Sequence, residues 1–547
     1  MNVRHIFLSL ILLWGIFQLR AESFTAGDLM FETRGDVRCT LTSGNEAGGE
    51  VIIPSSVSFE NNTYIVDEIA ARAFIGNTAI TSVTLPPTIT RIGSDAFRRC
   101  SYLKDVHAST LESWMTIDFE NEKATPLSNG ATLLIDGAPL THLVVPESVT
   151  TIDRYAFFDC MTLTEAEIGD QVTAIESFAF DGCENLSRVS LGNSIESIGM
   201  NAFNICGSLI DINIPQSVQS IGPACFYGCS SLKDISLPES LTEIPTLAFS
   251  GCLSLTDLSF LPRSVKSVGE YAFYNCTGLR QAHLPAAVDS IGQYAFCECS
   301  SLEEAVIPND KASLGGFIFI ECHALKSVRL PQGLDSIPSG LFCDCTALTD
   351  VVIPPTVTRI GDYAFGDCMS LPYIEFPEGL EHIGSLSFYG CRLLKSLEFG
   401  TSMKSIATEA FYECPSLREI RCHPIDPISI SYFTFDSNAD SNVSVYVPEI
   451  SVDRYLDNMG WAAFKHFYGE KSYNPPSNLT IFFGDGGSVS RIVAYATSLT
   501  MNLADADGSL PVRIVLDGTD VTDRMQPDGS FTTPEITGPM TLRIYSR

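Results

Sequence analysis

Cysteine has the most regular spacing of any residue in this chain that could carry out chemistry. The 547-residue sequence holds 18 cysteines. Twelve of them recur in register, at Cys160, Cys183, Cys206, Cys229, Cys252, Cys276, Cys299, Cys322, Cys345, Cys368, Cys391 and Cys414. Each step is 23 residues except one of 24. Thiols can pair, bind a metal or act as nucleophiles, but this even spacing predicts a repeating coil with cysteine at one fixed position.

Stacking of such coils argues against disulfides within the cysteine column. Together with Cys100, thirteen cysteines share the repeat position, and stacked strands would hold them about 5 Å apart with parallel side chains. A disulfide needs Cβ atoms about 3.8 Å apart that point at each other. We therefore predict a ladder of reduced, inward-facing thiols. One bridge or a loose metal site stays open for the other cysteines, which are Cys39, Cys225, Cys297, Cys343 and Cys422.

The remaining reactive residues form no recognisable catalytic motif. The sequence has no H-E-x-x-H, G-x-S-x-G or G-x-x-x-x-G-K pattern. His323 follows Cys322, but that cysteine belongs to the ladder and is expected to face inward. The run 505–508 resembles part of a calcium loop, yet its first and twelfth positions would be Leu503 and Ile514, which cannot bind calcium. The sequence therefore predicts a non-enzymatic protein with no cofactor and no metal.

The repeat around the cysteines has apolar residues at strand-like positions. Thirteen segments in 69–424 share the pattern, and each has two short alternating stretches such as 232–237 and 241–244. Pro238 ends the first of these stretches. One coil cannot bury its apolar face alone, whereas stacked coils share a core. We predict a mainly β solenoid of 23-residue coils, followed by a small all-β, sandwich-like domain.

Sequences on either side of the repeats suggest further parts. The chain begins with a charged end, an apolar run over 6–17 and a small-residue site at 19–21, as in secretory signal peptides. That run is too short for a membrane span, and no cysteine lies near the site to receive a lipid. The expected parts are a signal peptide (1–21), an N-terminal cap (22–68), the solenoid (69–424, with an insertion at 107–139), a C-terminal cap with a helix (425–470), a linker (471–478) and the all-β domain (479–547).

Two of these parts carry specific structural expectations. In the insertion, Trp114 and Phe119 should pack back onto the solenoid, with ligand contact by Trp114 as the alternative. In the C-terminal cap, 443–448 reads as a last strand, and Ser451 should cap a helix. The apolar face of that helix should hold Val452, Tyr455, Leu456, Met459 and Phe464.

Charge limits the class of partner. The chain has 33 basic and 65 acidic residues, for a formal net charge of −32, and its basic residues do not cluster. Binding to nucleic acid depends on Lys and Arg that neutralise phosphates. We therefore exclude nucleic-acid partners and expect a soluble, exported chain without a transmembrane segment.

The repeat pattern identifies a family. Ile-Gly-x-x-Ala-Phe-x-x-Cys-x-x-Leu-x-x-Val-x-Ile-Pro resembles the BspA-like leucine-rich repeats of bacterial surface proteins over 69–424, and 460–464 resembles the closing cap of that family. The run 516–522 resembles a β module that often follows such repeats. Departures from the pattern are Leu314 for Ile, Pro245 and Pro338 for Gly, and Asn77 for Cys. The resemblance implies a secreted or surface protein that binds host or microbial macromolecules, extracellular matrix proteins among them, but it does not supply the ligand.

The outward position of the first strand is the candidate binding face. Down the stack it reads Ser190, Asn213, Ser236, Ser259, His283, Val306, Arg329, Val352, Glu375, Glu398 and Arg421. The first four are small and polar and the rest are bulky and varied, with Tyr373 in the neighbouring column. One interpretation is an ordinary solvated surface. The sharper hypothesis is a ligand footprint at His283, Arg329, Tyr373 and Glu375.

Other functional interpretations also stay open. Arg34-Gly35-Asp36 is the integrin-recognition tripeptide, although Gly-Asp is also ordinary turn chemistry. A glycan-binding accessory protein would need an aromatic platform, and a hydrolase would need an acidic pair in a cleft. We expect a secreted or cell-surface adhesion protein that binds a protein or glycan. Its ligand, anchoring route and oligomeric state do not follow from the sequence.

Overall fold

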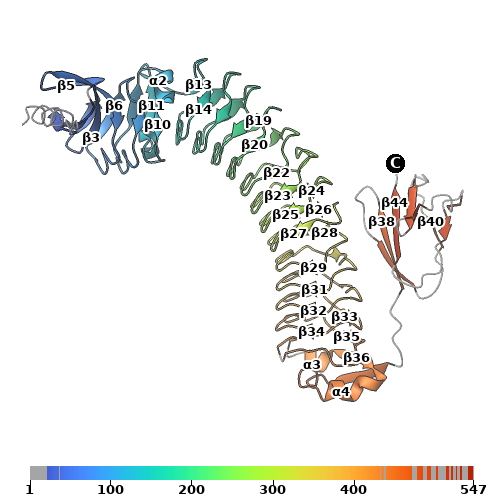
Figure 1. Ribbon diagram of the computed structural model, residues 1–547. Helices are drawn as coiled ribbons and strands as arrows, with labels where there is room; N and C mark the ends of the chain where they lie inside the picture. The colour runs from blue at the N-terminus through green and yellow to red at the C-terminus, as the bar shows by residue number, and fades with distance from the viewer. Residues whose placement is uncertain are drawn as a thin grey trace, which may run out of the picture. The chain divides into compact units, whose positions relative to one another are not determined.

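The computed structural model describes residues 21–35, 37–431, 433–436 and 439–470, and further strands between 477 and 545 (Figure 1). The predicted signal peptide, except its last residue, lies outside the described residues. So do positions 471–476 of the predicted linker and the turn at 505–508. The chain divides into two compact units, Met1–Leu279 and Arg280–Arg547, which are described separately below.

The first unit opens with a strand-rich cap. Its strands are β1 (Ser23–Ala26), β2 (Leu29–Arg34), β3 (Arg38–Ser43), β4 (Gly49–Ile52), β5 (Ser56–Phe59) and β6 (Asn62–Ile69). β2 and β3 are antiparallel and join at Gly35, whose φ of +73° suits glycine. These two strands therefore form a β-hairpin.

The repeats of the first unit form short parallel strands one coil apart. The first strand of successive coils gives β13 (His142–Val144), β15 (Glu165–Glu167), β17 (Arg188–Ser190), β19 (Asp211–Asn213) and β21 (Asp234–Ser236). The second strand gives β14 (Thr151–Ile152), β16 (Ala174–Ile175), β18 (Ser197–Ile198), β20 (Ser220–Ile221), β22 (Glu243–Ile244) and β23 (Ser267–Val268). Ile152 pairs with Ile175, one period later, as the 23-residue spacing predicts.

The second unit is built from coils of the same kind. Its first strands include β24 (Gln281–His283), β26 (Glu304–Val306), β28 (Ser327–Arg329), β30 (Asp350–Val351), β33 (Ser396–Phe399) and β35 (Glu419–Cys422). Its second strands are β25 (Ser290–Ile291), β27 (Ser313–Leu314), β29 (Ser336–Ile337), β31 (Arg359–Ile360), β32 (His382–Ile383) and β34 (Ser405–Ile406). The mainly β solenoid predicted from the repeats is confirmed.

The core of the coils is a stack of rings beside a ladder of thiols. Phe203 and Phe226 lie 5.7 Å apart with planes 3° from parallel. Cys229 is fully buried, and its Sγ donates to the carbonyl of Phe203 in the preceding coil at 3.1 Å. Burial raises the pKa of this thiol to about 12. All thirteen ladder cysteines are buried, so the predicted inward orientation is confirmed.

The first coil replaces the ladder cysteine with Asn77, and the structure gives the reason. Below this coil lies the cap, whose irregular backbone offers several unpaired polar groups. The Asn77 amide donates to the carbonyls of Gly44 and Ala47, and its oxygen accepts from the N–H groups of Ala79 and Ile80. A thiol could not satisfy this many groups.

The insertion at 107–139 builds a coil of its own. It runs through β9 (Asp105–Ala108), α2 (Leu111–Met115), β10 (Asp118–Phe119), η1 (Pro126–Asn129), β11 (Thr132–Ile135) and β12 (Ala138–Pro139). β10 pairs in parallel with β8 (Arg91–Ile92), and β11 pairs in parallel with β9. Trp114 and Phe119 are buried, and Trp114 Nε1 donates to the carbonyl of Ala156 at 2.7 Å. The predicted packing role is confirmed, and Trp114 is not available to a ligand.

The C-terminal cap corrects three expectations. The segment contains α3 (Ala439–Asn442), β36 (Ser444–Pro448), η2 (Glu449–Ser451), α4 (Val452–Leu456) and β37 (His466–Glu470). β36 is not the last strand, because β37 pairs with it in parallel. The Ser451 side chain forms no capping bond, and Met459 lies beyond the short helix with 92% of its surface exposed. The predicted apolar face is thus wrong for Leu456 and Met459, whereas Tyr455 is buried.

The C-terminal stretch consists of strands wherever it is described. They are β38 (Ser477–Phe483), β39 (Ser490–Ala494), β40 (Thr500–Asn502), β41 (Arg513–Leu516), β42 (Thr519–Asp520), β43 (Ser530–Thr532) and β44 (Met540–Tyr545). Five of them form one sheet in the order β39-β38-β44-β41-β42, and β40 pairs with β43. A separate sandwich-like domain here stays a prediction.

Candidate functional site

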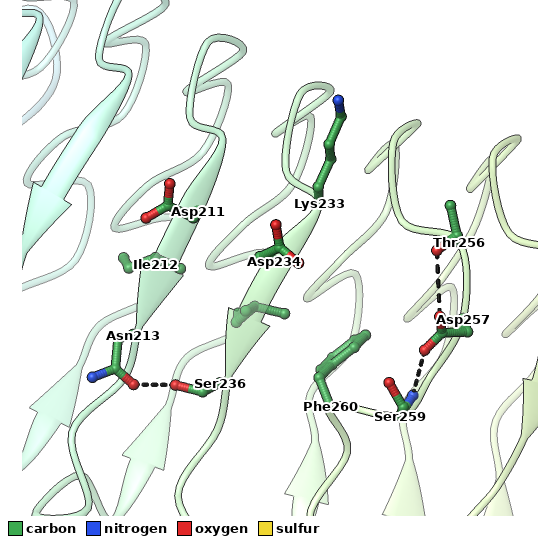
Figure 2. Close-up of a pocket in the computed structure, with 11 residues that line it drawn as sticks. Asp211, Ile212, Asn213, Lys233, Asp234, Ser236, Thr256, Asp257, Ser259 and Phe260 are labelled. Atoms are coloured by element: carbon green, nitrogen blue, oxygen red, sulfur yellow. Dashed lines mark hydrogen bonds between the residues drawn. The ribbon is translucent and has the colours of Figure 1, made fainter.

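The first-strand face of the first unit contains a hollow. It has a volume of about 350 Å³ and opens over three successive coils (Figure 2). Its lining combines carboxylates, one lysine, small polar side chains, two isoleucines and one aromatic ring. The lining residues are Asp211, Ile212, Asn213, Lys233, Asp234, Ile235, Ser236, Thr256, Asp257, Ser259 and Phe260.

An extra residue creates this hollow. The step from Cys252 to Cys276 is the single step of 24 residues, and the additional residue falls just before Pro262. The run 256–260 forms no strand, so the sheet that starts at β13 ends at β21. The Phe260 ring turns edge-on to the core ring of Phe249, with centroids 5.4 Å apart and planes at 70°. The pleated surface is therefore interrupted at this coil.

Asp257 shapes the wall of the hollow at the interrupted coil. One carboxylate oxygen accepts the Ser259 N–H at 2.9 Å, and the other accepts the Thr256 hydroxyl at 3.3 Å. These hydrogen bonds, with those from Ser259 as the largest cause, lower the pKa of the Asp257 carboxyl. The group is therefore ionised at neutral pH.

Two further carboxylates lie beside each other on the intact strands. Asp211 and Asp234 occupy paired positions of β19 and β21, and both are exposed. Among the described residues, neither side chain forms a salt bridge or hydrogen bond. Lys233 extends away from both of them in Figure 2. Below this pair, the Ser236 hydroxyl donates to Asn213 Oδ1, which gives the hollow an uncharged polar floor.

The footprint residues expected from the sequence lie in the second unit. His283 ends β24, Arg329 ends β28, and Val306 of β26 pairs with both, so the two share one column about 10 Å apart. His283 Nε2 lies 3.7 Å from Glu304 Oε2. Tyr373 and Glu375 are both exposed, on a stretch where no strand forms. The sheet thus brings two of the four together, and the others follow in later coils.

The integrin-type tripeptide is partly engaged within the chain. The Arg34 guanidinium forms ion pairs with Asp67 and Glu68 of β6. Asp67 is almost fully buried and also pairs with Arg38. These pairs hold Arg34 against the cap. Position 36 of the tripeptide lies outside the described residues.

Aromatic columns on the turns were not anticipated from the sequence. Pairs one coil apart stack face to face, as in Tyr155 with Phe178, Tyr294 with Phe317, and Tyr389 with Tyr412, whose centroids are 5.1, 5.2 and 6.3 Å apart. Their planes lie within 15° of parallel. Because the ring faces contact each other, mainly ring edges remain for solvent. The signal that could have revealed them is the recurrence of aromatic residues at two turn positions, five residues and two residues before the ladder cysteine.

The hollow was also missed from the sequence, although two signals point to it. One is the 24-residue step between Cys252 and Cys276, and the other is Phe260 next to a run of small outward residues. From the sequence, these small residues were interpreted as lying outside the predicted ligand footprint.

A family comparison identifies the repeats. The sequence model of the BspA-type leucine-rich repeat region matches six copies, over 53–127, 136–256, 242–371 and 335–466. The chain belongs to the BspA-type leucine-rich repeat family. The resemblance inferred from the repeat pattern is confirmed.

Solved structures of this kind resemble the chain. A leucine-rich repeat protein from Bacteroides ovatus is 26% identical, with a TM-score of 0.46 over 73% of this chain and 94% of that one. A leucine-rich cell surface protein from Faecalibacterium prausnitzii is 25% identical, with a TM-score of 0.45 and the same coverages. The pneumococcal vaccine antigen PcpA is 17% identical, with a TM-score of 0.33 over 83% of this chain and 99% of that one. A search of curated proteins found no matching relative.

Membership of the BspA-type family carries coarse functional information. Leucine-rich repeat proteins are generally non-enzymatic scaffolds that bind proteins, and BspA-type members are usually cell-surface proteins. Within the described residues, no helix is long and apolar enough to cross a bilayer. Nor do those residues place three or more His, Cys, Asp or Glu side chains as a metal site.

Proposed function

We propose that this protein is a secreted or cell-surface, non-enzymatic adhesion protein that presents its repeat face to a host or microbial macromolecule. The contrast between the two sides of each first strand carries this proposal. In β24, Ala282 is buried at 1% exposure between the exposed Gln281 and His283. The buried side repeats almost unchanged from coil to coil, whereas the exposed side varies. Core packing explains why the buried side stays nearly constant, and ligand binding explains why the exposed side varies.

The footprint is placed on the second unit, around His283, Arg329, Tyr373 and Glu375. Arginine and tyrosine dominate the energy of many protein interfaces, because they combine a large apolar surface with hydrogen-bonding groups. Tyr373 exposes 55% of its surface, on a stretch of the first-strand face where no strand forms. An exposed tyrosine beside charged residues suits a partner that buries its ring and pairs its hydroxyl.

The proposal includes the ends of the chain. A signal peptide at 1–21 would export the protein, and an all-β domain at 479–547 would serve as a spacer or attachment module. The N-terminal cap (22–68), the C-terminal cap (425–470) and the linker (471–478) complete this organisation.

A glycan ligand has less support than a protein ligand. Sugars pack on the faces of aromatic rings, and the turn columns use those faces for stacking on each other. A hydrolase would need a carboxylic acid with a raised pKa in a cleft. In the hollow, hydrogen bonds from Ser259 lower the pKa of Asp257 instead.

Binding of the purified chain to immobilised extracellular matrix proteins tests the proposal. Arg329→Ala and Tyr373→Ala should each weaken binding by at least about 1 kcal/mol, or roughly fivefold. Arg188→Ala is the matched control, because Arg188 is 74% exposed on the same face of the first unit and forms only a 3.7 Å ion pair with Glu165. Equal losses for all three variants would place the site elsewhere. An absence of binding to matrix proteins and to a panel of host cells would refute adhesion itself.

A further inference from the structure

We propose that the hollow over β19, β21 and the interrupted coil is a subsite for a lysine or arginine side chain of a basic protein segment. The site lies in the first unit and does not include the footprint around His283. It rests on the proposed function only in taking a protein as the ligand.

Unbalanced charge at the mouth of the hollow is the first argument. Asp211 and Asp234 are cross-strand neighbours about 4.8 Å apart, and like charges directly opposite each other destabilise a sheet. Asp257 adds a third carboxylate in the next coil, already held in its charged form. Arg188 lies opposite Asp211 on the neighbouring strand, but its ion pair is with Glu165, and among the described residues none of the three carboxylates forms a salt bridge. A cation from outside would relieve the repulsion.

The shape and lining of the hollow supply the second argument. About 350 Å³ is enough for one long side chain and the backbone around it, and falls at the lower end of small-ligand sites. Phe260 is partly exposed and lines the space, so it offers an apolar wall to an alkyl stem and a ring to a guanidinium. Asn213 and Ser236 provide uncharged oxygen atoms at the floor. Figure 2 shows Phe260 between the strand that carries Asp234 and the interrupted coil that carries Asp257.

The same features disfavour other occupants. A sugar would need a broad aromatic platform, but the lining holds just one aromatic ring, the partly exposed Phe260. A metal ion would need converging ligands, and the described residues contain no such group of acidic side chains. A basic segment also agrees with the formal net charge of −32, which attracts cations over long range.

Peptide binding to the complete chain tests the subsite directly. The probe is a fluorescein-labelled tetra-arginine peptide at 0.15 M salt, and the same peptide with citrulline in place of arginine is the uncharged reference. The test variant Asp211→Asn with Asp234→Asn should weaken tetra-arginine binding at least tenfold. The control, Glu147→Gln with Glu196→Gln, removes two exposed charges from the same unit and should change binding by less than twofold.

Three outcomes would overturn the proposal. One is equal weakening by the two double variants, which would mean non-specific attraction. Another is equal binding of the arginine and citrulline peptides. The third is binding of chitotetraose that is lost in the Asp211/Asp234 variant while tetra-arginine binding is unchanged, which would make the site a glycan site.

A ring substitution and the choice of probe complete the test. Phe260→Leu keeps the apolar wall but removes the ring, and a loss of about threefold is expected. Full tetra-arginine affinity in Phe260→Leu would contradict the role given to the ring. Because the probe is synthetic, a failure here leaves the matrix-binding result untouched, and the reverse also holds.

Discussion

Asp181 gives the sharpest stability prediction, because it is a buried acid whose charge is poorly supported. Only 7% of the residue is exposed, and its only hydrogen-bond donor among the described side chains is Asn204, at 2.8 Å. Burial is the largest cause that raises the pKa of Asp181 to about 7, and the nearby Asp159 and Glu122 add to the effect. The ionised carboxylate therefore destabilises the native state at neutral pH.

The sign and size of the effect follow from this shift. A rise of about 3 pKa units corresponds to about 4 kcal/mol between the protonated and ionised forms. Because the folded pKa is raised, stability is greatest below the unfolded pKa near 4 and falls as pH rises to about 7. Asp181→Asn keeps the shape and removes the charge. Its new amide also provides a donor for Asn204 Oδ1, which has no partner among the described groups. After allowing for the burial of an amide, we expect a gain of about 2 kcal/mol at pH 8 and almost none at pH 4.

Hydrogen exchange is the assay, because unfolding of a repeat protein is local and need not be two-state. Protection of the amides around 179–206 should rise in Asp181→Asn at pH 8, relative to the parent, after correction for intrinsic exchange rates. Glu196→Gln, at an exposed position of the same coil, is the control and should leave protection unchanged. A gain of the same size at pH 4 and pH 8, or a loss at pH 8, would refute the reasoning.

Two further predictions concern the core. Cys229→Ser should lower the free energy of unfolding by about 1–2 kcal/mol, because the hydroxyl keeps the Phe203 carbonyl as an acceptor but is costlier to bury than a thiol. Denaturant titration measures this loss. A loss above about 4 kcal/mol would mean that the hydrogen bond to Phe203 is not kept. Trp114→Ala should cost about 3–5 kcal/mol, because it removes a fully buried ring and its bond to the Ala156 carbonyl. Limited proteolysis should then cut first within 107–139, and unchanged resistance there would contradict the anchoring role.

The parts of the fold that follow from periodicity were predictable. Each ladder cysteine and each core phenylalanine faces inward because a 23-residue period returns it to the same angular position, as Phe203 and Phe226 show. The parallel register also follows, since Ile152 must meet Ile175 for the apolar rows to align. Local pattern and global packing agree at these positions, so the sequence alone was enough.

The hollow could not be derived in the same way. A single added residue shifts every later side chain of its strand to the other face unless the chain bulges. The sequence shows the addition before Pro262 but not how the backbone absorbs it. In the structure the strand is abandoned, and the Asp257 carboxylate replaces lost backbone bonds with bonds to Thr256 and Ser259. Choosing among such solutions depends on competing local hydrogen bonds of similar energy.

The helix predicted in the C-terminal cap was wrong for a related reason. A 3.6-residue pattern around 452–464 predicted one helix, but the chain leaves the helix after Leu456 and returns as β37. Trp461 takes the place that the pattern gave to Met459, because its ring fills the end of the core and Nε1 reaches the Ile428 carbonyl at 2.7 Å. At this point, covering the open end of the solenoid stabilises the fold more than continuing the helix would.

The thiol ladder also determines how the protein responds to oxidants. At a pKa of about 12, as for Cys229 and Cys276, only about one thiol in 10⁵ is a thiolate at pH 7, and thiolate is the form that attacks disulfides. Folding therefore makes these cysteines kinetically inert without pairing them. In the exported chain that we propose, the thiols would be vulnerable only until the coils close. The rate of coil stacking, rather than an oxidase, would then decide whether they stay reduced.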